Sequence, residues 1–121
     1  MQHLIEQAWQ RRNDITPKDE ELKIIVDNVL KDLDDGLLRV ASKISMGWQV
    51  HEWLKQALLL SFRLNSNRSM TYPLPGYDKV ESKFENWSSQ DFEKAQIRVV
   101  PGALLRSATY SEPSGVLSPN C

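Results

Sequence analysis

The sequence predicts a small α+β domain that is rich in helix and contains one β-hairpin. Three observations lead to this fold class. Two amphipathic helical patterns fill the first 36 residues, the apolar period changes from about 3.6 to 2 after Gly36, and a third helical pattern is apolar on nearly every side. This third stretch, residues 50–65, reads VHEWLKQALLLSFRLN. Such a helix is typically enclosed by its own domain, so we expect the other elements to pack around it.

Length and charge limit the classes of protein that need to be considered. A chain of 121 residues is one domain by length and can bury a core without disulfides or metals. Its 15 basic and 16 acidic residues leave a net charge of -1, which argues against nucleic acid and gives no reason to invoke an anionic membrane. The apolar stretch at 50–65 is too short and too charged to span a bilayer. We therefore expect neither nucleic acid nor a membrane as a partner.

The cysteine content and the first residues predict a compartment. The only cysteine is Cys121, so no internal disulfide and no thiolate metal cluster is expected. Residues 1–14 contain no apolar run of the length that a signal peptide requires. Together these features predict a cytoplasmic protein.

Two helices are expected first. Residues 2–14 place their apolar side chains on one stripe. Residues 16–19 (Thr-Pro-Lys-Asp) predict the start of a second helix, because an N-cap hydroxyl, a proline at the first helical position and an acid three residues after the cap occur together. Gly36 is suited to the left-handed position after the helix end. The expected core positions of this second helix are Leu22, Ile25, Val26, Val29, Leu30 and Leu33.

The alternating segment predicts a β-hairpin beside the helices. Residues 38–44 and 48–50 alternate apolar and polar side chains, and residues 45–47 (Ser-Met-Gly) are suited to a turn between them. Trp48 and Trp53 lie on a strand and on a helix that need large apolar side chains. We therefore expect both to pack in the core rather than to stack on a ligand.

The second half of the chain is less regular. Residues 65–76 are dense in turn formers and predict a loop. Residues 77–87 predict an irregular segment whose larger apolar side chains dock on the core, namely Val80, Phe84 and Trp87. Residues 88–95 predict a short helix that begins with a capping box, because Ser88 stands three residues before Asp91.

A short strand and a polar tail end the chain. Residues 97–101 predict the strand, which ends at a proline that cannot donate to a ladder. Residues 102–121 are rich in Ser, Gly and Pro, and we expect this tail to find no strand partner within the chain and to be poorly packed from Ser107 onward.

The usual enzyme signatures are absent from the sequence, which has no Gly-rich phosphate loop, no His-Glu metal motif and no Gly-x-Ser-x-Gly elbow. His3 is expected to be solvated, and His51 to be a structural or capping residue. The adjacent acids Asp34 and Asp35 are expected to face different directions rather than to act as a carboxylate pair. No metal ligand and no catalytic residue is therefore predicted within this chain.

Arginines offer the remaining candidates for recognition. Arg11 and Arg12 are expected to form a solvated helix face. Arg98 lies between Ile97 and Val99, where it is either the outward member of an edge strand or an anion-recognition group on a stiff backbone. Periodicity alone favours the solvated interpretation.

A resemblance to a known family changes that balance. It is carried by residues 5–6 with Ala8, 11–12, 15–17, 36–41 (GLLRVA), 48–55 (WQVHEWLK), 57–65 (ALLLSFRLN), 78–80 with 83–84, and 98–103 (RVVPGA) up to Arg106. In order and spacing these stretches resemble the N-terminal part of the bacterial tetrahydrodipicolinate N-succinyltransferases, acyltransferases of lysine (diaminopimelate) biosynthesis. The resemblance covers nearly the whole chain.

The resemblance implies a fold and an assembly. Residues 1–101 would form a helix-rich N-terminal α+β cap domain, and residues 102–121 a linker and the first, incomplete coil of a left-handed parallel β-helix built from hexapeptides. Leu105 and Leu117 stand two hexapeptide steps apart, whereas Ser111 at the step between them departs from the expected aliphatic residue. The complete enzyme would be a homotrimer.

The resemblance also implies a reaction, the transfer of succinyl from succinyl-CoA to the amine of ring-opened tetrahydrodipicolinate. Succinyl-CoA would be a co-substrate and no cofactor would be bound. The catalytic acid or base and the CoA contacts are expected beyond Cys121, so this piece alone is expected to be inactive. By motif match, Arg98 would hold a carboxylate of the small dicarboxylate substrate. Two alternatives stay open: a non-catalytic stand-alone binding or assembly module derived from that domain, and a structural fragment without a ligand.

Overall fold

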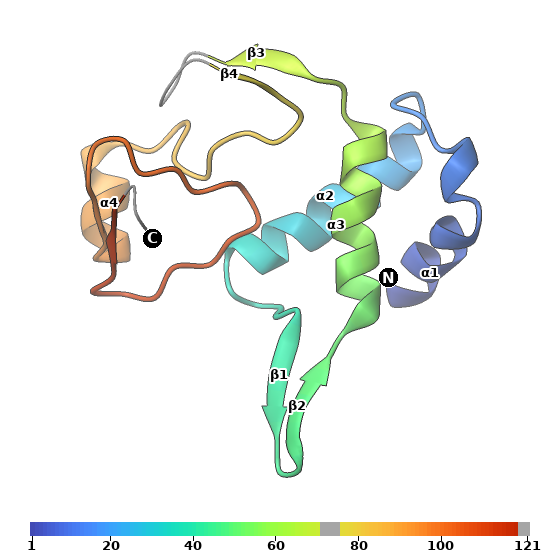
Figure 1. Ribbon diagram of the computed structural model, residues 1–121, viewed down its shortest axis with the longest axis horizontal. Coiled ribbons are helices and arrows are strands. Elements are labelled where there is room, and N and C mark those ends of the chain that lie inside the picture. The colour runs from blue at the N-terminus through green and yellow to red at the C-terminus, as the bar shows by residue number, and fades with distance from the viewer. Residues whose placement is uncertain (71–75, 119–121) are drawn as a thin grey trace.

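Three helices form the main body of the molecule (Figure 1). In the computed structural model, which describes residues 1–70 and 76–118, these helices are α1 (Gln2–Gln10), α2 (Glu20–Asp34) and α3 (Glu52–Leu64). The helix α3 packs on both α1 and α2, as their apolar stripes predict. This part of the predicted architecture is confirmed.

The main core lies between these helices. Its buried apolar residues are Ile5, Ala8, Ile15, Leu22, Val26, Val29, Leu33, Leu54, Ala57, Leu60 and Leu64. The α2 stripe is buried as predicted at Leu22, Val26, Val29 and Leu33, while Ile25 and Leu30 are partly buried against the same cluster. The spacing of three and four residues therefore located the core face of α2 correctly.

Both early helices differ from their expected boundaries. The first helix ends at Gln10, and Arg12–Asp14 form a separate 3-10 turn. The second helix begins at Glu20 rather than directly after Thr16, whose hydroxyl instead accepts a hydrogen bond from the Lys18 backbone N–H at 3.3 Å. The helix-start signals are thus used to form a turn, because a short side-chain-to-backbone bond competes with the helix at this position.

The helix α3 is buried on one side only, contrary to the expectation that it is enclosed. Leu60 is fully buried, whereas its neighbour Leu59 is 48% exposed and Phe62 is at the surface. Leu58 is partly buried against the core. The apolar residues on the outer face of α3 therefore remain available to solvent or to a partner.

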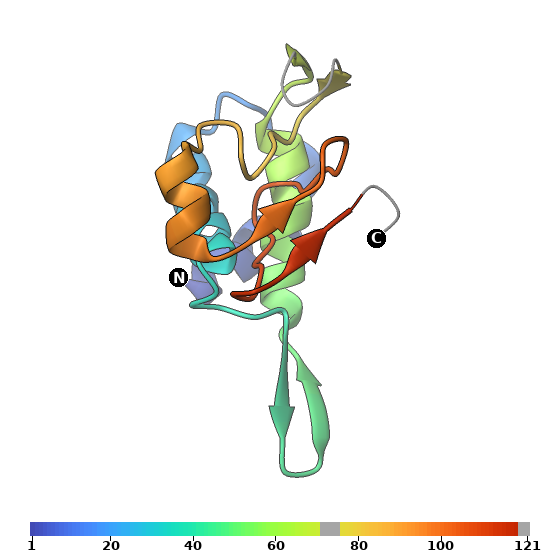
Figure 2. The same ribbon diagram turned by 90° about the vertical axis from the view of Figure 1, so that its left-hand side faces the viewer.

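The predicted hairpin exists, but it does not lie alongside the helices. The strands β1 (Ala41–Ile44) and β2 (Gly47–Val50) are antiparallel and extend away from the helical body as a free arm (Figures 1 and 2). The first strand begins three residues later than expected. Trp48 is 70% exposed, so the expectation that it packs in the core is wrong, while Trp53 is partly buried against the core as expected.

The stretch expected to be a loop contains a second hairpin. Its strands are β3 (Arg68–Met70) and β4 (Gly76–Asp78), paired antiparallel with Ser69 opposite Tyr77. Residues 71–75 of the predicted loop lie outside the described residues. The turn-forming composition of this stretch did not reveal the short strands β3 and β4.

A second, smaller apolar cluster lies under α4 (Ser89–Ala95). Phe84 is buried there, with ring centroids 4.9 Å from Trp87 and 5.3 Å from Phe92. These aromatic side chains therefore pack on one another. The expectation that Phe84 and Trp87 dock on the main core is wrong. The capping box of α4 is confirmed, because Ser88 and Asp91 exchange hydrogen bonds between side chain and backbone.

The tail does find a strand partner, so the expectation that it has none is wrong. The strand β5 (Arg98–Val99) pairs in parallel with β6 (Val116–Leu117), with Arg98 opposite Val116 and Val99 opposite Leu117. The register joins residues 18 positions apart in sequence. The Arg98 backbone N–H donates to the Gly115 carbonyl at 3.0 Å, which fixes the start of the pair.

The chain between these two strands turns at regular intervals. Left-handed backbone conformations occur at Gln96, Gly102, Ala108 and Ser114, with φ of 58°, 93°, 73° and 70°. They recur every six residues, so that three six-residue sides bring the chain back beside its own start. The result is one turn of a coil with a hexapeptide period.

This coil is also attached to the helical body, contrary to the expectation of a poorly packed tail. The Ala108 backbone N–H donates to the Asp34 carboxylate at 3.1 Å, and the Arg39 guanidinium lies over the Tyr110 ring, 4.2 Å from its centroid. Gly36 permits this approach, since a Cβ atom there would lie 2.8 Å from the Tyr110 ring. The coil thus packs against the C-terminal end of α2.

Candidate functional site

Arg98, the sequence-predicted substrate contact, stands at the start of β5. Its side chain is exposed, while the next residue, Val99, is partly buried on the opposite face of the strand. Within residues 1–70 and 76–118, the Arg98 guanidinium has no hydrogen bond and no ion pair. The backbone on both sides of it is held by the N–H bonds of Arg98 to Gly115 and of Val100 to Leu117, at 3.0 and 2.8 Å. The site therefore offers a fixed backbone and an unused pair of guanidinium donors.

An open cavity of about 620 Å³ lies beside this strand. Its walls come from residues 97–103 together with Ser82, Phe84 and Phe92. Arg98 is the one charged side chain among these lining residues, and the others are apolar or small. An apolar hollow with a single unpaired cation is suited to an organic anion, whose carboxylate the guanidinium would bind while the hollow takes the carbon skeleton.

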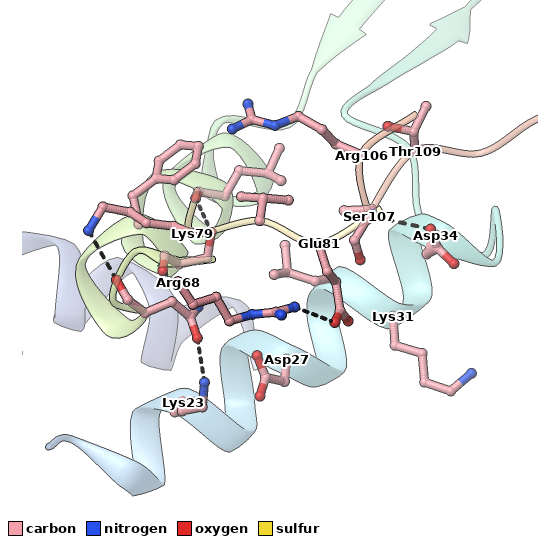
Figure 3. Close-up of a pocket in the computed structure, with 17 residues that line it drawn as sticks. Lys23, Asp27, Lys31, Asp34, Arg68, Lys79, Glu81, Arg106, Ser107 and Thr109 are labelled. Carbon is pink, nitrogen blue, oxygen red and sulfur yellow. Dashed lines mark hydrogen bonds and ion pairs between the residues drawn. The ribbon is translucent and has the colours of Figure 1, made fainter. Parts of the chain in front are cut away.

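A second cavity, of about 630 Å³, lies between α2, α3 and the segments around residues 79–81 and 106–109 (Figure 3). Its lining is strongly charged, yet the basic groups already have partners. Lys23 donates to the Asn65 side chain at 2.5 Å, Arg68 pairs with Glu81 at 3.2 Å, and Arg106 pairs with Asp78 at 2.7 Å. The cations are therefore used to join neighbouring segments, and this cavity is a weaker candidate for binding an anion.

Two carboxylates near this second cavity have pKa values shifted in opposite directions. A hydrogen bond with Glu85, followed by partial burial, raises the pKa of Glu81, and Arg68 opposes the shift. The hydrogen bond from Arg106, with a further one from the Lys79 backbone N–H, lowers the pKa of Asp78. Glu81 and Glu85 thus share one arginine, which lies 3.2 and 3.4 Å from their carboxylates.

No local sequence pattern predicts the most buried ion pair among residues 1–70 and 76–118. The Lys83 ammonium lies 2.9 Å from the Asp34 carboxylate and also donates to the Asp34 carbonyl at 2.9 Å. Asp35 instead pairs with Lys31 at 2.6 Å, so the two adjacent acids do face different partners, as expected. Lys83 reaches the end of α2 only through the tertiary fold, because the two residues of the pair are far apart in the sequence.

The histidines take the roles expected of them. His3 is exposed on α1. The His51 Nε2 atom lies 2.9 Å from the Ser42 hydroxyl, and the His51 backbone N–H donates to the Val40 carbonyl at 2.7 Å. His51 thereby closes the base of the β1–β2 hairpin. Although serine and histidine are in contact, neither lines either of the two cavities, which favours a structural role for the pair.

Arg11 and Arg12 lie at the surface but are not simply solvated. Arg11 pairs with Asp19 at 3.1 Å, and the Arg12 guanidinium lies 4.5 Å from the centroid of the Trp9 ring. These contacts stabilise the turn between α1 and α2. Among the described residues, no group of three or more His, Cys, Asp or Glu side chains is arranged to hold a metal ion. No helix in the described part of the chain is long and apolar enough to cross a membrane.

Comparison with known proteins identifies the class to which this chain belongs. The model of the tetrahydrodipicolinate N-succinyltransferase N-terminal family matches residues 1–64, which is more than half of the chain. The chain therefore belongs to the tetrahydrodipicolinate N-succinyltransferase family.

Individual relatives extend the match over the remaining residues. The 2,3,4,5-tetrahydropyridine-2,6-dicarboxylate N-succinyltransferase of Cupriavidus metallidurans is 44% identical over 124 residues, covering 99% of this chain and 45% of its own length. The proteins of the same name from Dechloromonas aromatica and Acinetobacter baylyi are 41% and 43% identical, over 99% and 97% of this chain. The chain spans somewhat less than half the length of each of these relatives.

Proposed function

We propose that this chain is the N-terminal part of an enzyme that transfers succinyl from succinyl-CoA to the amine of ring-opened tetrahydrodipicolinate. The observation that carries the proposal is the match of nearly the whole chain to relatives named for this N-succinyltransferase reaction. The same proposal includes the cytoplasmic location and the absence of membrane or nucleic-acid partners, which the sequence predicts, and the homotrimer, which the family resemblance implies.

The reaction joins an amine to a thioester carbonyl. The nitrogen lone pair attacks the carbonyl carbon, the tetrahedral oxyanion collapses, the carbon–sulfur bond breaks and the CoA thiolate leaves, while a base removes the proton from the nitrogen. Such a step requires a base near the amine and donors near the oxyanion. We assign both to the part of the relatives that this chain does not cover, and no cofactor is required.

Residues of this chain would contribute recognition of the acceptor. The acceptor is a small dicarboxylate, and the Arg98 guanidinium, which has no partner among residues 1–70 and 76–118, can offer two parallel N–H donors to one carboxylate. The support for this role is its unused donors, its stiff backbone and the apolar hollow beside it. The neighbouring arginine, Arg106, is already paired with Asp78 and is therefore the weaker candidate.

We further propose that residues 96–117 begin a left-handed parallel β-helix. Two features support this: left-handed backbone conformations that recur every six residues, and a parallel pair whose register is three hexapeptides long. Val99, Leu105, Ser111 and Leu117 also recur at this period and are all partly buried. Because the polar Ser111 takes the same half-buried place as its aliphatic counterparts, the period persists through this exception.

The test compares the 121-residue chain with a chimaera in which residues 1–118 continue into the remainder of the Cupriavidus metallidurans relative. Release of CoA from succinyl-CoA that depends on the amine acceptor is expected from the chimaera and not from the short chain. An inactive chimaera that is folded and assembles like the intact relative would contradict the proposed activity. Turnover by the purified short chain would contradict the assignment of the chemistry to the part that is not covered.

A further inference from the structure

The β1–β2 arm presents an apolar face that nothing in the described structure covers. In its antiparallel register Ala41 lies opposite Val50 and Lys43 lies opposite Trp48, so these four residues share one face. Trp48 is 70% exposed and Val50 is 50% exposed. We call these four residues the Trp48 face.

An uncovered arm of this kind is energetically incomplete. A two-stranded hairpin is marginally stable in water unless a third strand or another surface packs on it. Here the bonds of His51 to Ser42 and Val40 join the two sides of the hairpin at its base, and every residue of β2 is exposed. Contiguous exposed apolar side chains on such an element indicate a contact surface.

The direction of the arm indicates what would cover it. Figure 2 shows β6 on the side of β5 towards which the hairpin points. Successive coils of a parallel β-structure stack at about 4.8 Å, so a chain that continued from residue 118 would add its coils in roughly that direction. In Figures 1 and 2 the arm begins below the level of the coil and points away from the helical body. The next coils would therefore grow along the arm.

We infer that the Trp48 face packs against the outer surface of the β-helix coils that follow residue 118 of the same chain. The inference rests on the proposed function, because it requires the continuation that the longer relatives have, of which this chain spans less than half. The hairpin is then a brace that fixes the orientation of the β-helix relative to the helical domain. Trp48 supplies the main apolar contact, and the Lys43 ammonium reaches past it to solvent.

The first experiment measures hydrogen–deuterium exchange in the short chain and in the chimaera described above. Amides of residues 41–50 are expected to exchange at least tenfold more slowly in the chimaera. Amides of the β3–β4 hairpin serve as the internal control and are expected to change little. Trp48→Ala should abolish the gain in protection at residues 41–50 while leaving the exchange of the short chain nearly unaltered.

The outcomes separate the two proposals. If residues 98–117 gain protection and residues 41–50 do not, the brace is contradicted and the β-helix proposal stands. If neither segment gains protection, the proposed β-helix continuation fails and the brace fails with it.

A second experiment identifies the occupant. Chimaera subunits labelled with ¹⁵N and unlabelled subunits are mixed during assembly, and the Lys43 amine is cross-linked to nearby lysines. Cross-links within one isotopic form only are expected. Cross-links that join the two forms would show that the face is covered by a neighbouring copy, and would overturn the same-chain assignment.

Discussion

Lys83 and Asp34 form an ion pair of 2.9 Å in which the lysine side chain is only 6% exposed. The pair joins the segment that carries the aromatic cluster to the end of α2. The same Asp34 carboxylate accepts the Ala108 backbone N–H at 3.1 Å. The Asp34 carboxylate thus contacts both the segment that carries Lys83 and the coil.

Removing the lysine should therefore destabilise the protein substantially. Lys83→Met leaves Asp34 without its cation, and breaking a buried pair from one side typically costs about 3 kcal/mol or more. Urea denaturation followed by circular dichroism would measure the loss. Lys31→Met breaks the exposed pair with Asp35 and should cost less than about 1 kcal/mol. Equal effects of the two substitutions would contradict the special role of Lys83.

Gly36 should tolerate no side chain. Its φ of 77° is unfavourable for alanine, and the added Cβ would meet the Tyr110 ring at 2.8 Å. We expect Gly36→Ala to reduce the free energy of unfolding by roughly 1 to 3 kcal/mol. Gly76→Ala is the matched control, since no atom of the described residues lies within 4 Å of the added Cβ. A Gly36→Ala protein as stable as this control would argue against the Gly36–Tyr110 contact.

Two adjacent leucines test how α3 is buried. Leu60 is fully buried, so Leu60→Ala should cost about 2 to 5 kcal/mol. Leu59 is 48% exposed, and Leu59→Ala should cost about 1 kcal/mol or less in the 121-residue chain. Thermal or urea unfolding would measure the loss of stability in both variants. A similar large loss for both would restore the original expectation of an enclosed helix.

The contribution of Glu81 to the free energy of unfolding should fall as the pH rises. The folded state raises the pKa of Glu81 above its ordinary value of 4.5, so the folded protein binds more protons than the unfolded chain between that value and the raised one. Protonation of Glu81 therefore stabilises the fold at low pH, and this contribution is lost as the pH rises through the raised pKa. The free energy of unfolding of Glu81→Gln, measured between about pH 4 and 8, should not show this decrease with rising pH.

The control for the pH series is Glu93→Gln, which changes an exposed carboxylate on α4. Its unfolding curve should follow that of the unmodified chain at each pH. If Glu81→Gln follows the unmodified chain equally well, the Glu81–Glu85 interaction does not contribute to stability.

Arg98 should determine use of the acceptor in the chimaera. Loss of one charge-assisted contact is worth roughly 1.5 to 3 kcal/mol, so Arg98→Ala should lower kcat/KM for the acceptor about tenfold to a hundredfold. Arg98→Lys should recover only part of the loss, because lysine lacks the two-pronged geometry. Steady-state kinetics with each substrate varied separately would measure both effects.

The succinyl-CoA dependence of Arg98→Ala should change little, and Lys94→Ala, an exposed cation on nearby α4, should behave like the unmodified chimaera. A defect confined to succinyl-CoA, or no defect at all, would return Arg98 to the solvated-strand interpretation.

By itself the sequence determined the features whose cause is local. The α2 stripe at Val26 and Val29, the capping box of Ser88 and Asp91 and the existence of the β1–β2 hairpin follow from periodicity or from groups a few residues apart, and the structure contains all three. The short strands β3 and β4 escaped prediction, because strands of three residues carry too few alternations to be distinguished from a loop.

Only the tertiary structure decided how distant segments meet. The exposure of Trp48 follows from the direction in which the hairpin leaves the body, and an alternating pattern cannot specify that direction. The pairing of Arg98 with Val116 and the burial of Lys83 beside Asp34 bring together residues many positions apart. Their cause is the closure of the coil on the end of α2, where long-range contacts, which have no local sequence signal, outweigh the entropy of ordering the tail.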